Sequence, residues 1–281
     1  MKTIKNHVTH HAIERKKMAD HRSFVADDYL ESRYKDVPNN DRVHFLLNGF
    51  HEVFQSLPHS LKILDYGSGP VIQNCISAAA HASEIVFSDI AESNREAVRK
   101  WLRREPTAFN WSPHFDYVVQ TLEGKGEKEA REREEMLRKV VKGVVHCDIF
   151  AEPPIEKGFE GPYDVVIEGG CLNSACTNTE SFKKGLVTLS HLIKPGGSIL
   201  RWGEVLSMEE STTVYSVGKE EYNYLCTERE FVIDAVKQAG FSSVHMQYCE
   251  HDHSKVSKQV IYRPEFQGLY FIQAKKTALV V

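Results

Sequence analysis

Apolar positions along this chain fall into two alternating patterns: short runs typical of buried strands, and longer stretches with helical spacing. Glycine, proline or polar residues bound most of the short runs. The expected strands are Leu61–Asp65, Glu84–Phe87, His146–Phe150, Tyr163–Ile167, Ser198–Trp202, Ser243–Glu250 and Gly268–Lys275. The expected helices are Phe24–Val37, Asp41–Leu57, Ser93–Arg104, Glu127–Val141, Glu180–Leu192 and Glu228–Ala239. Strands that alternate with helices predict an α/β fold, closed here by a C-terminal hairpin.

A glycine turn follows the first expected strand. Gly67 and Gly69 lack side chains, so backbone amides can approach a ligand closely at this turn. We expect a helix directly after it, ending near Ala82. The next strand delivers Asp89 at its carboxyl end, where open α/β sheets bind ligands. A carboxylate at that place can accept hydrogen bonds from both hydroxyls of a ribose.

The glycine turn leaves two ligand classes open, a dinucleotide and a nucleoside with a charged tail. The dinucleotide fingerprint requires a third glycine or alanine, and this chain has Ile72 there. The turn also has no lysine of the P-loop type. Asp65, at the end of the first strand, can fix the glycine loop or reach a cationic ligand group through water. The pattern favours the nucleoside over a dinucleotide oxidoreductase.

Charge and length narrow the classes of partner. A chain of 281 residues fits one large α/β domain with attachments. The formal net charge of −4 gives no electrostatic footprint for nucleic acid or for an anionic membrane surface. No apolar stretch approaches the roughly 20 residues needed to span a bilayer. We therefore expect no nucleic-acid or membrane partner.

The cysteines indicate the compartment. Six are scattered along the chain without a C-x-x-C pair, and Met1 leads into polar residues rather than an apolar signal sequence. A disulfide framework is not expected, which favours the cytoplasm. Cys171 and Cys176 flank a small-residue turn, but no histidine is placed by a motif to activate either thiol. We interpret them as buried apolar residues rather than nucleophiles.

The N-terminal region divides into a tail and a cover. Residues 1–22 hold several histidines but little apolar material, and no acidic or cysteine ligand pattern accompanies them. We expect a flexible tail and no metal site. Residues 23–58 supply an amphipathic helix with Tyr29 and Tyr34, then a core helix. The two tyrosines either dock their helix on the core or belong to a lid that excludes water from the ligand.

Several motifs in one order point to a known family. The D-x-G-S-G-P turn resembles motif I of the class I S-adenosylmethionine (SAM) methyltransferases. DYLESRY, SDIAESN, EPTAFNWSP, LEGKGE, CDIF, GGCLNSAC and IKPGGSIL occur around and after it, of which EPTAFNWSP and LEGKGE are the most specific. Together they resemble the small-molecule N-methyltransferase family of nicotinamide, phenylethanolamine and indolethylamine (thioether) N-methyltransferases. The resemblance runs from about Tyr29 to Lys275.

The resemblance implies a fold and a cofactor site. The implied fold is one domain over residues 23–281, a class I SAM-dependent methyltransferase with a seven-stranded, mostly parallel sheet, helices on both faces, an antiparallel C-terminal hairpin and an N-terminal helical lid. The cofactor is SAM, which leaves as S-adenosylhomocysteine. By motif, the implied SAM-binding residues are Tyr29, Tyr34, Gly67, Ser68, Gly69, Asp89, Ile90, Asn94, Asp148, Ile149 and Gly169. Asp89 and Asn94 match ribose contacts, and Asp148 and Ile149 match adenine contacts.

The acceptor side departs more from the family pattern. Residues 203–226 form an expected acceptor-site insertion with a longer loop than its counterparts. Tyr215 resembles an aromatic residue that stacks on the acceptor ring, and Glu265 resembles an acid that binds an amine. Glu204 falls near an aspartate of the nicotinamide enzymes, and Asn173 stands where relatives carry an acid. The implied acceptor-binding residues are Tyr29, Asn173, Glu204, Tyr215 and Glu265.

The expected chemistry is transfer of the SAM methyl group to nitrogen of a small aromatic molecule, a nicotinamide-like pyridine or an arylalkylamine. A pyridine nitrogen needs no base, whereas an ammonium must first lose a proton. Glu204 and Glu265 are the main candidates for catalytic groups that bind the amine or accept this proton, and Glu209 and Glu210 are secondary candidates. We expect a monomer. The alternative is a catalytically silent SAM-binding scaffold, which the long loop and Asn173 motivate.

Overall fold

The structure, a computed structural model, describes residues 18–206, 211–250 and 266–278. Its strands are β1 Leu61–Tyr66, β2 Ala82–Asp89, β3 Val141–His146, β4 Tyr163–Gly169, β5 Ile193–Leu206, β6 Thr212–Val217, β7 Glu220–Leu225, β8 Phe241–Glu250 and β9 Phe266–Lys276. Its α-helices are α1 Ala26–Tyr34, α2 Asp41–Ser56, α3 Glu92–Leu102, α4 Ser112–Asp116, α5 Glu127–Val140, α6 Cys171–Ala175, α7 Thr179–His191 and α8 Arg229–Gln238.

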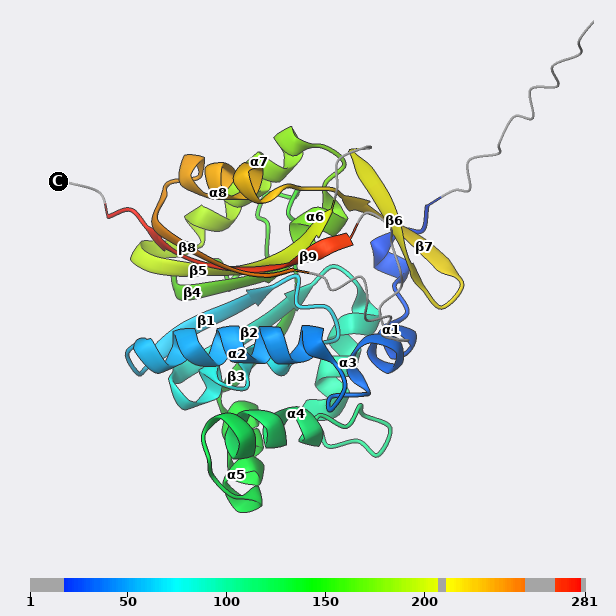
Figure 1. Ribbon diagram of the computed structural model, residues 1–281, viewed down its shortest axis with the longest axis vertical. Helices are drawn as coiled ribbons and strands as arrows, with labels where there is room; N and C mark the ends of the chain where they lie inside the picture. The colour runs from blue at the N-terminus through cyan, green and yellow to red at the C-terminus, as the bar shows by residue number, and fades with distance from the viewer. Residues whose placement is uncertain (1–17, 207–210, 251–265, 279–281) are drawn as a thin grey trace, which may run out of the picture.

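Seven strands form one sheet in the order β3-β2-β1-β4-β5-β9-β8. The neighbours from β3 to β5 are parallel, and β9 is antiparallel to both β5 and β8. Figure 1 shows α6, α7 and α8 on one face of this sheet and α2, α4 and α5 on the other. The order reverses at β1 and β4, and a crevice forms at such a point in open α/β sheets. The predicted α/β fold with a C-terminal hairpin is confirmed.

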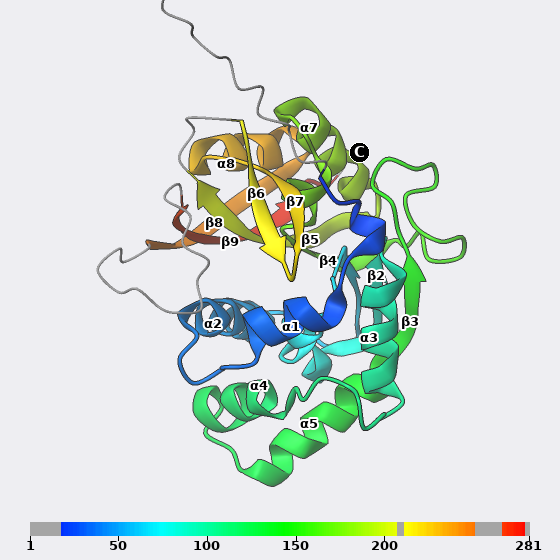
Figure 2. The same cartoon turned by 90° about the vertical axis from the view of Figure 1, so that its right-hand side faces the viewer.

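A separate two-stranded hairpin, β6–β7, stands beside the edge formed by the carboxyl ends of the parallel strands. Figure 2 shows it above α1, which crosses the same side of the molecule. Gly203 to Leu206 belong to β5, where Gly203 pairs with Tyr270 of β9. The predicted insertion over 203–226 therefore begins later than expected, because β-sheet pairing with β9 extends β5 to Leu206.

Two segments differ from the sequence prediction: the one that follows the glycine turn, and the third strand. Instead of an α-helix, Gln73–Cys75 and Ala78–Ala80 form two separate 3-10 turns. The third strand is Val141–His146 rather than 146–150, since the β-branched Val144 and Val145 pair with Phe87 and Ser88 of β2. Residues 147–150 instead form the turn that follows this strand.

The predicted tail boundary at residue 22 also falls inside the folded part of the chain. The amide of Ala19 donates to the carbonyl of Glu221 on β7 over 2.9 Å. A 3-10 turn, His21–Ser23, follows, with Asp20 accepting from the amide of Arg22. The ring of His21 packs 5.1 Å from that of Tyr222, so aromatic contact holds this segment against the hairpin.

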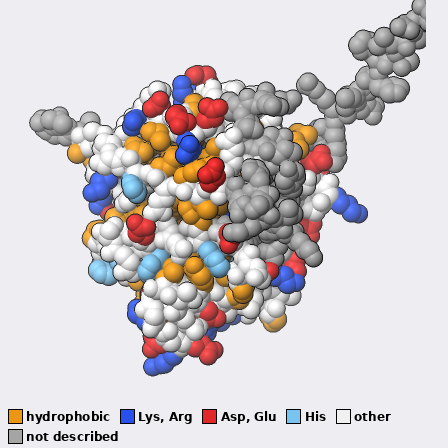
Figure 3. All heavy atoms as spheres, viewed as in Figure 1, with side chains coloured by type: hydrophobic (Ala, Val, Ile, Leu, Met, Phe, Trp, Pro, Cys, Tyr) orange, Lys and Arg blue, Asp and Glu red, His pale blue; other side chains and the backbone are white. Residues whose placement is uncertain are grey.

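Apolar packing fixes the elements that carry the site. One core cluster joins α1 and α2 to β1, β2 and the 100–137 region, and a second joins β4, β5 and β9 to α7 and α8. A third, smaller cluster centres on Phe24, Tyr215, Tyr222 and Tyr224, where the N-terminal segment meets the hairpin. On the face in Figure 3, acidic and basic side chains are interspersed among the described residues. None of the described helices is long and apolar enough to cross a membrane.

Candidate functional site

A cavity of about 390 Å³ lies at the carboxyl ends of the parallel strands, roofed by the N-terminal segment and the β6–β7 hairpin. Its volume is in the range of small-molecule sites. The sequence-predicted residues that line it are Tyr29, Tyr34, Gly67, Ser68, Gly69, Asp89, Ile90, Asn94, Asp148, Ile149, Gly169, Glu204 and Tyr215. The tertiary fold thus brings residues as far apart in sequence as Tyr29 and Tyr215 around one space.

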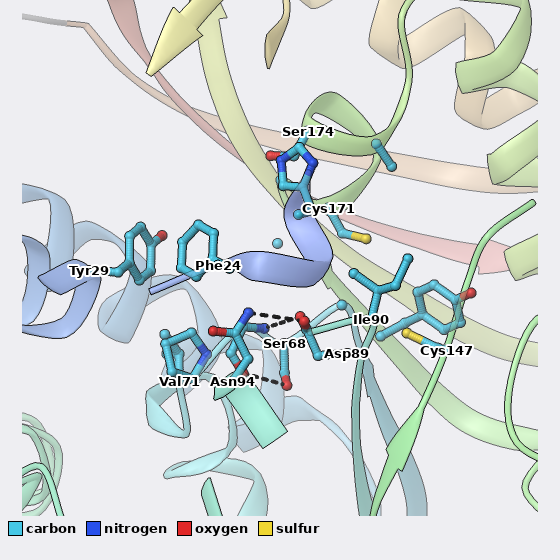
Figure 4. A pocket seen from close by; sticks show the side chains of 18 of the residues that line it. Phe24, Tyr29, Ser68, Val71, Asp89, Ile90, Asn94, Cys147, Cys171 and Ser174 are labelled. Carbon is cyan, nitrogen blue, oxygen red and sulfur yellow. Dashed lines mark hydrogen bonds between the residues drawn. The ribbon is translucent and has the colours of Figure 1, made fainter. Parts of the chain in front are cut away.

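Asp89 is held at the end of β2 by three donors. Its Oδ2 accepts from the amide of Gly69 over 2.8 Å, and its Oδ1 accepts from the amide of Ala91 over 2.8 Å and from Asn94 Nδ2 over 3.0 Å. Figure 4 shows Asp89 and Asn94 pointing toward each other. Burial raises the pKa of Asp89, and the donors from Ala91, Asn94 and Gly69 act against that shift. The carboxylate is therefore oriented before any ligand arrives.

The glycine turn leaves the cavity floor open. Gly67 and Gly69 have φ of 64° and 63°, a conformation that side chains disfavour. A Cβ on Gly67 would lie 2.2 Å from Cys171 Sγ, whereas a Cβ on Gly69 would meet nothing within 4 Å. Because only 3-10 turns follow, the turn offers no α-helix N-terminus for a pyrophosphate. Without a helix dipole at the turn, a dinucleotide is further disfavoured as the ligand of this site.

Behind the turn, Asp65 is fully buried and does not line the cavity. Asn74 Nδ2 donates to its Oδ2 over 3.2 Å, and Asn74 itself lines the cavity. Burial raises the pKa of Asp65 to about 8, with the Asn74 hydrogen bond acting in the other direction. Of its two expected roles, the structure supports fixing the loop through Asn74.

The turn after β3 supplies the far wall. Asp148 Oδ1 accepts from the amide of Phe150 over 3.0 Å, and Ile149 is buried beside it. Phe150 is 60% exposed, so it can cover a flat ligand only from the cavity's edge. Cys147 also lines this wall, and burial raises the pKa of its thiol to about 12. Such a thiol is protonated at neutral pH and behaves as an apolar surface.

The N-terminal segment covers the cavity with aromatic rings. Tyr34 is 1% exposed and packs 5.8 Å from the ring of Trp111, so it is part of the core as well as of the wall. Tyr29 is half-buried, with its ring 5.2 Å from that of Phe24 in an edge arrangement. In Figure 4, Phe24 and Tyr29 enter from the side opposite Ile90 and Cys147. Both tyrosines pack against the core and also line the cavity, so the docking expectation holds, and the lid that excludes water stays a prediction.

The hairpin closes the cavity from above. Tyr215 lies on β6 with its hydroxyl 3.2 Å from His21 Nε2, and its ring stacks 5.4 Å from that of Tyr222. Tyr224 of β7 also lines the cavity, and its hydroxyl accepts from the amide of Glu204 over 3.4 Å. Burial lowers the pKa of His21, which keeps its imidazole neutral at physiological pH. This end of the cavity is lined by aromatic rings and by the carboxyl group of Glu204.

Asn173 does not reach the cavity, contrary to the sequence prediction. It is fully buried, and its Nδ2 donates to the carbonyl of Leu225 over 2.9 Å and to Thr227 Oγ1 over 3.1 Å. Its Oδ1 accepts from the guanidinium of Arg201, which also pairs with Glu168. The buried Arg201 requires hydrogen-bond acceptors on several sides, and Asn173 supplies one of them. Asn173 thereby connects Leu225, at the end of β7, to β5.

Three other expected residues, Glu209, Glu210 and Glu265, lie outside the described residues. Across the parts of the chain that the structure describes, no group of three His, Cys, Asp or Glu side chains is arranged to hold a metal ion.

All six cysteines are thiols outside any disulfide, of which Cys75, Cys147, Cys176 and Cys226 are buried. Burial raises the pKa of Cys171 as well, so neither thiol beside the turn at Gly170 is activated as a nucleophile.

Sequence reasoning missed several residues of the cavity wall, among them His21, Arg42 and Trp202. The sequence prediction assigns His21 to the tail, although Phe24, three residues further on, is a signal that the segment can pack. Arg42 follows Asp41, where the expected helix begins, and Trp202 is the last residue of the expected strand Ser198–Trp202, although β5 continues to Leu206. A tryptophan at a strand's carboxyl end is the signal that could have found the last of these.

The cavity fits SAM on its own observations. Asp89 is oriented at the end of β2, where the sequence predicts a ribose contact, and the adjacent Asn94 Oδ1 is buried without a hydrogen-bond partner among the described residues, so it can accept from a ligand hydroxyl. The turn is open at Gly69, and the wall after β3, where the sequence predicts the adenine contacts, is lined by the apolar Ile149 and by Asp148. This fold and this site define a class I SAM-dependent methyltransferase.

The comparisons with known proteins identify the family. Residues 11–277 match the family model described as the NNMT/PNMT/TEMT family, and the chain belongs to that family. It is 32% identical to nicotinamide N-methyltransferase of Homo sapiens, over 90% of this chain and 93% of that protein. It is 31% identical to indolethylamine N-methyltransferase of Oryctolagus cuniculus, over 82% and 87%, and 31% identical to phenylethanolamine N-methyltransferase of Macaca mulatta, over 77% and 74%.

Solved structures agree in fold. A SAM-dependent methyltransferase from Methanosarcina mazei superposes with a TM-score of 0.53 at 12% identity, covering 81% of this chain and 97% of that one. The CcbJ methyltransferase from Streptomyces caelestis also gives 0.53, at 11% identity, covering 92% and 98%. The predicted class I methyltransferase sheet and the predicted family are confirmed.

Proposed function

We propose that this protein transfers the methyl group of SAM to nitrogen of a small aromatic acceptor, either a nicotinamide-like pyridine or an arylalkylamine. The observation that carries the proposal is one continuous cavity with two unlike ends. Asp89 and the glycine turn lie at one end, and Tyr215, Tyr224 and Glu204 lie at the other. Family membership and the acceptors named for the relatives support the same chemistry.

The cofactor end binds through contacts already in place. Asp89 and Asn94 would hold the ribose hydroxyls, and Asp148 with Ile149 would receive the adenine. Gly67, Ser68 and Gly69 would border the methionine portion. When bound, SAM supplies an electrophilic methyl group on a sulfonium. Gly169, at the end of β4, would lie beside that end, and its missing side chain lets Trp202 pack closely, since a Cβ there would lie 2.5 Å from Trp202 Nε1.

The acceptor end would orient the substrate nitrogen toward the methyl group rather than increase its reactivity. Displacement at a sulfonium methyl needs no acid for the leaving thioether, so alignment of the nitrogen can supply most of the acceleration, with effective molarities of about 10⁵ M or more in well-oriented systems. Tyr215 and Tyr29 would confine an aromatic ring. Glu204 would bind an amine or amide N–H and could pass a proton to water for an ammonium acceptor. Glu265 remains a sequence-based prediction for the same task.

The test is S-adenosylhomocysteine formation by the purified protein with nicotinamide, quinoline, phenylethanolamine and tryptamine offered separately at two pH values. Turnover of the pyridines that is flat with pH would support a ring-nitrogen enzyme. Turnover of the amines that rises with pH would support a site in which an ammonium loses its proton first. SAM binding with no turnover of any nitrogen acceptor contradicts the proposal and favours the silent scaffold.

The proposal includes a monomeric protein and a cytoplasmic location. Described residues of a single chain line both ends of the cavity, and we propose that the protein acts as a monomer. Free buried thiols are suited to a reducing compartment, which favours the cytoplasm. Sedimentation equilibrium tests the first point, and an activity that requires a dimer would contradict it. Localisation of the tagged full chain in its own cells tests the second.

A further inference from the structure

Arg42 places a positive charge on the wall of the cavity. It is the second residue of α2, and its Nε and Nη1 atoms are buried without a hydrogen-bond acceptor among the described residues. Burying charged donors without acceptors is unfavourable, so such a group is normally satisfied when the site is filled. The guanidinium is therefore a site feature that neither the cofactor contacts nor the acceptor contacts described above use.

Two aromatic rings hold this guanidinium in position. Its Cζ lies 4.8 Å from the ring centroid of Trp202 and 5.6 Å from that of Tyr34. Trp202 is 5% exposed and Tyr34 is 1% exposed, so both rings are fixed by the core. Glu204 is near enough to attract Arg42 electrostatically. Cation–π contacts of this kind orient the charge but leave the N–H donors of the guanidinium available to a ligand.

The strand order places Arg42 at the acceptor end. Asp89 ends β2, and the glycine turn follows β1, whereas Trp202 and Glu204 lie on β5, two strands beyond β1. Trp202 is the register partner of Gly169, which borders the methyl-donating end in the proposed function. A ligand group beside the guanidinium and Trp202 therefore lies on the far side of the transferred methyl from the ribose.

We propose that Arg42 binds a carboxylate of the acceptor, so that the preferred substrate is an aromatic molecule with both a methylatable nitrogen and a carboxylate. This inference rests on the proposed function. A carboxylate oxygen accepts a charge-assisted hydrogen bond from a guanidinium, which would satisfy Nε or Nη1 and fix the direction of the acceptor ring. Trp202 gives that ring an apolar surface. Glu204 at the same end suits the N–H of an amine, so Arg42 and Glu204 together select a dipolar acceptor.

Matched acceptor pairs test the proposal. They are pyridine-3-carboxylate against pyridine-3-carboxamide, and tryptophan against tryptamine, measured as kcat/KM for S-adenosylhomocysteine formation. We expect the carboxylate member of at least one pair to be preferred about tenfold or more. Arg42→Gln is expected to lower kcat/KM for that member by about tenfold or more and to change its neutral partner less than about threefold. Arg42→Lys, which keeps the charge without the fork, is expected to fall between.

Two controls separate Arg42 from general charge and from the cofactor. Arg22→Gln removes the same charge from the cavity's exposed rim, where Arg22 already pairs with Asp20, and should leave the preference intact. The SAM dissociation constant of Arg42→Gln should match the native value. A raised SAM dissociation constant with no change in acceptor preference would assign Arg42 to the methionine carboxylate and overturn the proposal. Equal losses for both members of each pair would overturn it as well.

Failure of the proposed function is distinguishable from failure of this inference. Calorimetry on the protein loaded with S-adenosylhomocysteine reads acceptor binding without turnover. Tighter binding of pyridine-3-carboxylate than of the carboxamide, lost in Arg42→Gln, supports the carboxylate site even where no acceptor is methylated. Tighter binding of the carboxamide, or no difference between native protein and variants, refutes it.

Discussion

The backbone amide of Gly69 donates a hydrogen bond to Oδ2 of Asp89 over 2.8 Å, which joins the glycine turn after β1 to the end of β2. This one contact links the two roles proposed for the site, bordering the cofactor tail and binding its ribose. The second oxygen of Asp89 is fixed by Ala91 and Asn94. A change at either partner is expected to affect cofactor binding first.

Replacing Asp89 tests the ribose assignment. We expect Asp89→Ala to raise the SAM dissociation constant about tenfold or more, because a hydrogen bond to a charged group contributes about 1.5–3 kcal/mol. Isothermal titration calorimetry with SAM measures the change. Asp27→Ala, at an exposed position in the first turn of α1, is the control and should bind as the native protein does. Native SAM affinity in Asp89→Ala would refute the ribose role.

Two glycines with the same backbone conformation form a matched pair. Gly67→Ala should destabilise the protein more than Gly69→Ala, because both adopt positive φ but only the Cβ at position 67 meets Cys171, at 2.2 Å from Sγ. Strain at φ alone costs about 1–2 kcal/mol. Thermal unfolding of both variants measures the difference. Adding Cys171→Gly to Gly67→Ala should recover part of the loss, and equal melting temperatures for the two single variants would contradict the contact.

Tyr215 is expected to act through its ring. Tyr215→Ala should lower kcat/KM for aromatic acceptors by about tenfold, since an aromatic contact contributes about 0.5–1.5 kcal/mol beyond the area that it buries. Tyr215→Phe keeps the ring and loses only the hydroxyl near His21, so its loss should be smaller. Val214, the neighbouring residue on β6, is 41% exposed, and Val214→Ala is the control. A Tyr215→Phe loss as large as that of Tyr215→Ala would assign the role to the hydroxyl.

Asp65 predicts a pH dependence of stability. Burial raises its pKa in the folded protein to about 8 from an ordinary 3.8, so between these values the folded state holds a proton that the unfolded state has released. The contribution of Asp65 is fully present below pH 3.8 and is lost as the pH rises through 8. The free energy of unfolding should fall by up to about 1.4 kcal/mol per pH unit in that window.

Asp65→Asn should remove this slope, because the amide does not ionise. Urea unfolding at pH 5, 7 and 9 measures it, with Asp27→Asn as the exposed control. The variant should lose less stability than the native protein between pH 5 and pH 9. Parallel pH profiles for native protein and Asp65→Asn would show that the buried carboxyl does not titrate in this range.

The buried pair of Arg201 and Glu168 is expected to be structural. Both side chains are fully buried, and Glu168 Oε1 also accepts from the amide of Leu172 over 2.8 Å at the start of α6. Arg201→Met should destabilise the protein by about 3–5 kcal/mol, because Glu168 is left as an uncompensated buried charge. Urea unfolding measures the loss. Glu168→Gln in the same variant should restore part of it, and no recovery in the double variant would contradict the charge argument.

Local pattern determined the class of fold and the cofactor end of the site. Periodic apolar runs predict strands and helices because one face of each must be buried. The position of Asp89 follows from the length of its strand, and the glycines reveal their turn because few other residues adopt that backbone. Motifs confined to one short stretch of chain are visible without the fold, since their residues are brought together by local geometry alone.

The acceptor end was decided by tertiary structure. Asn173 occupies a family position, but the presence of Arg201, distant in sequence and adjacent in space, diverts its amide into a buried network. Arg42 and Trp202 are 160 positions apart, yet packing of α2 against the sheet sets the guanidinium 4.8 Å from the ring. His21 meets Tyr215 only because the hairpin folds back over the N-terminal segment. Contacts between distant segments depend on how whole elements pack, which no local pattern records.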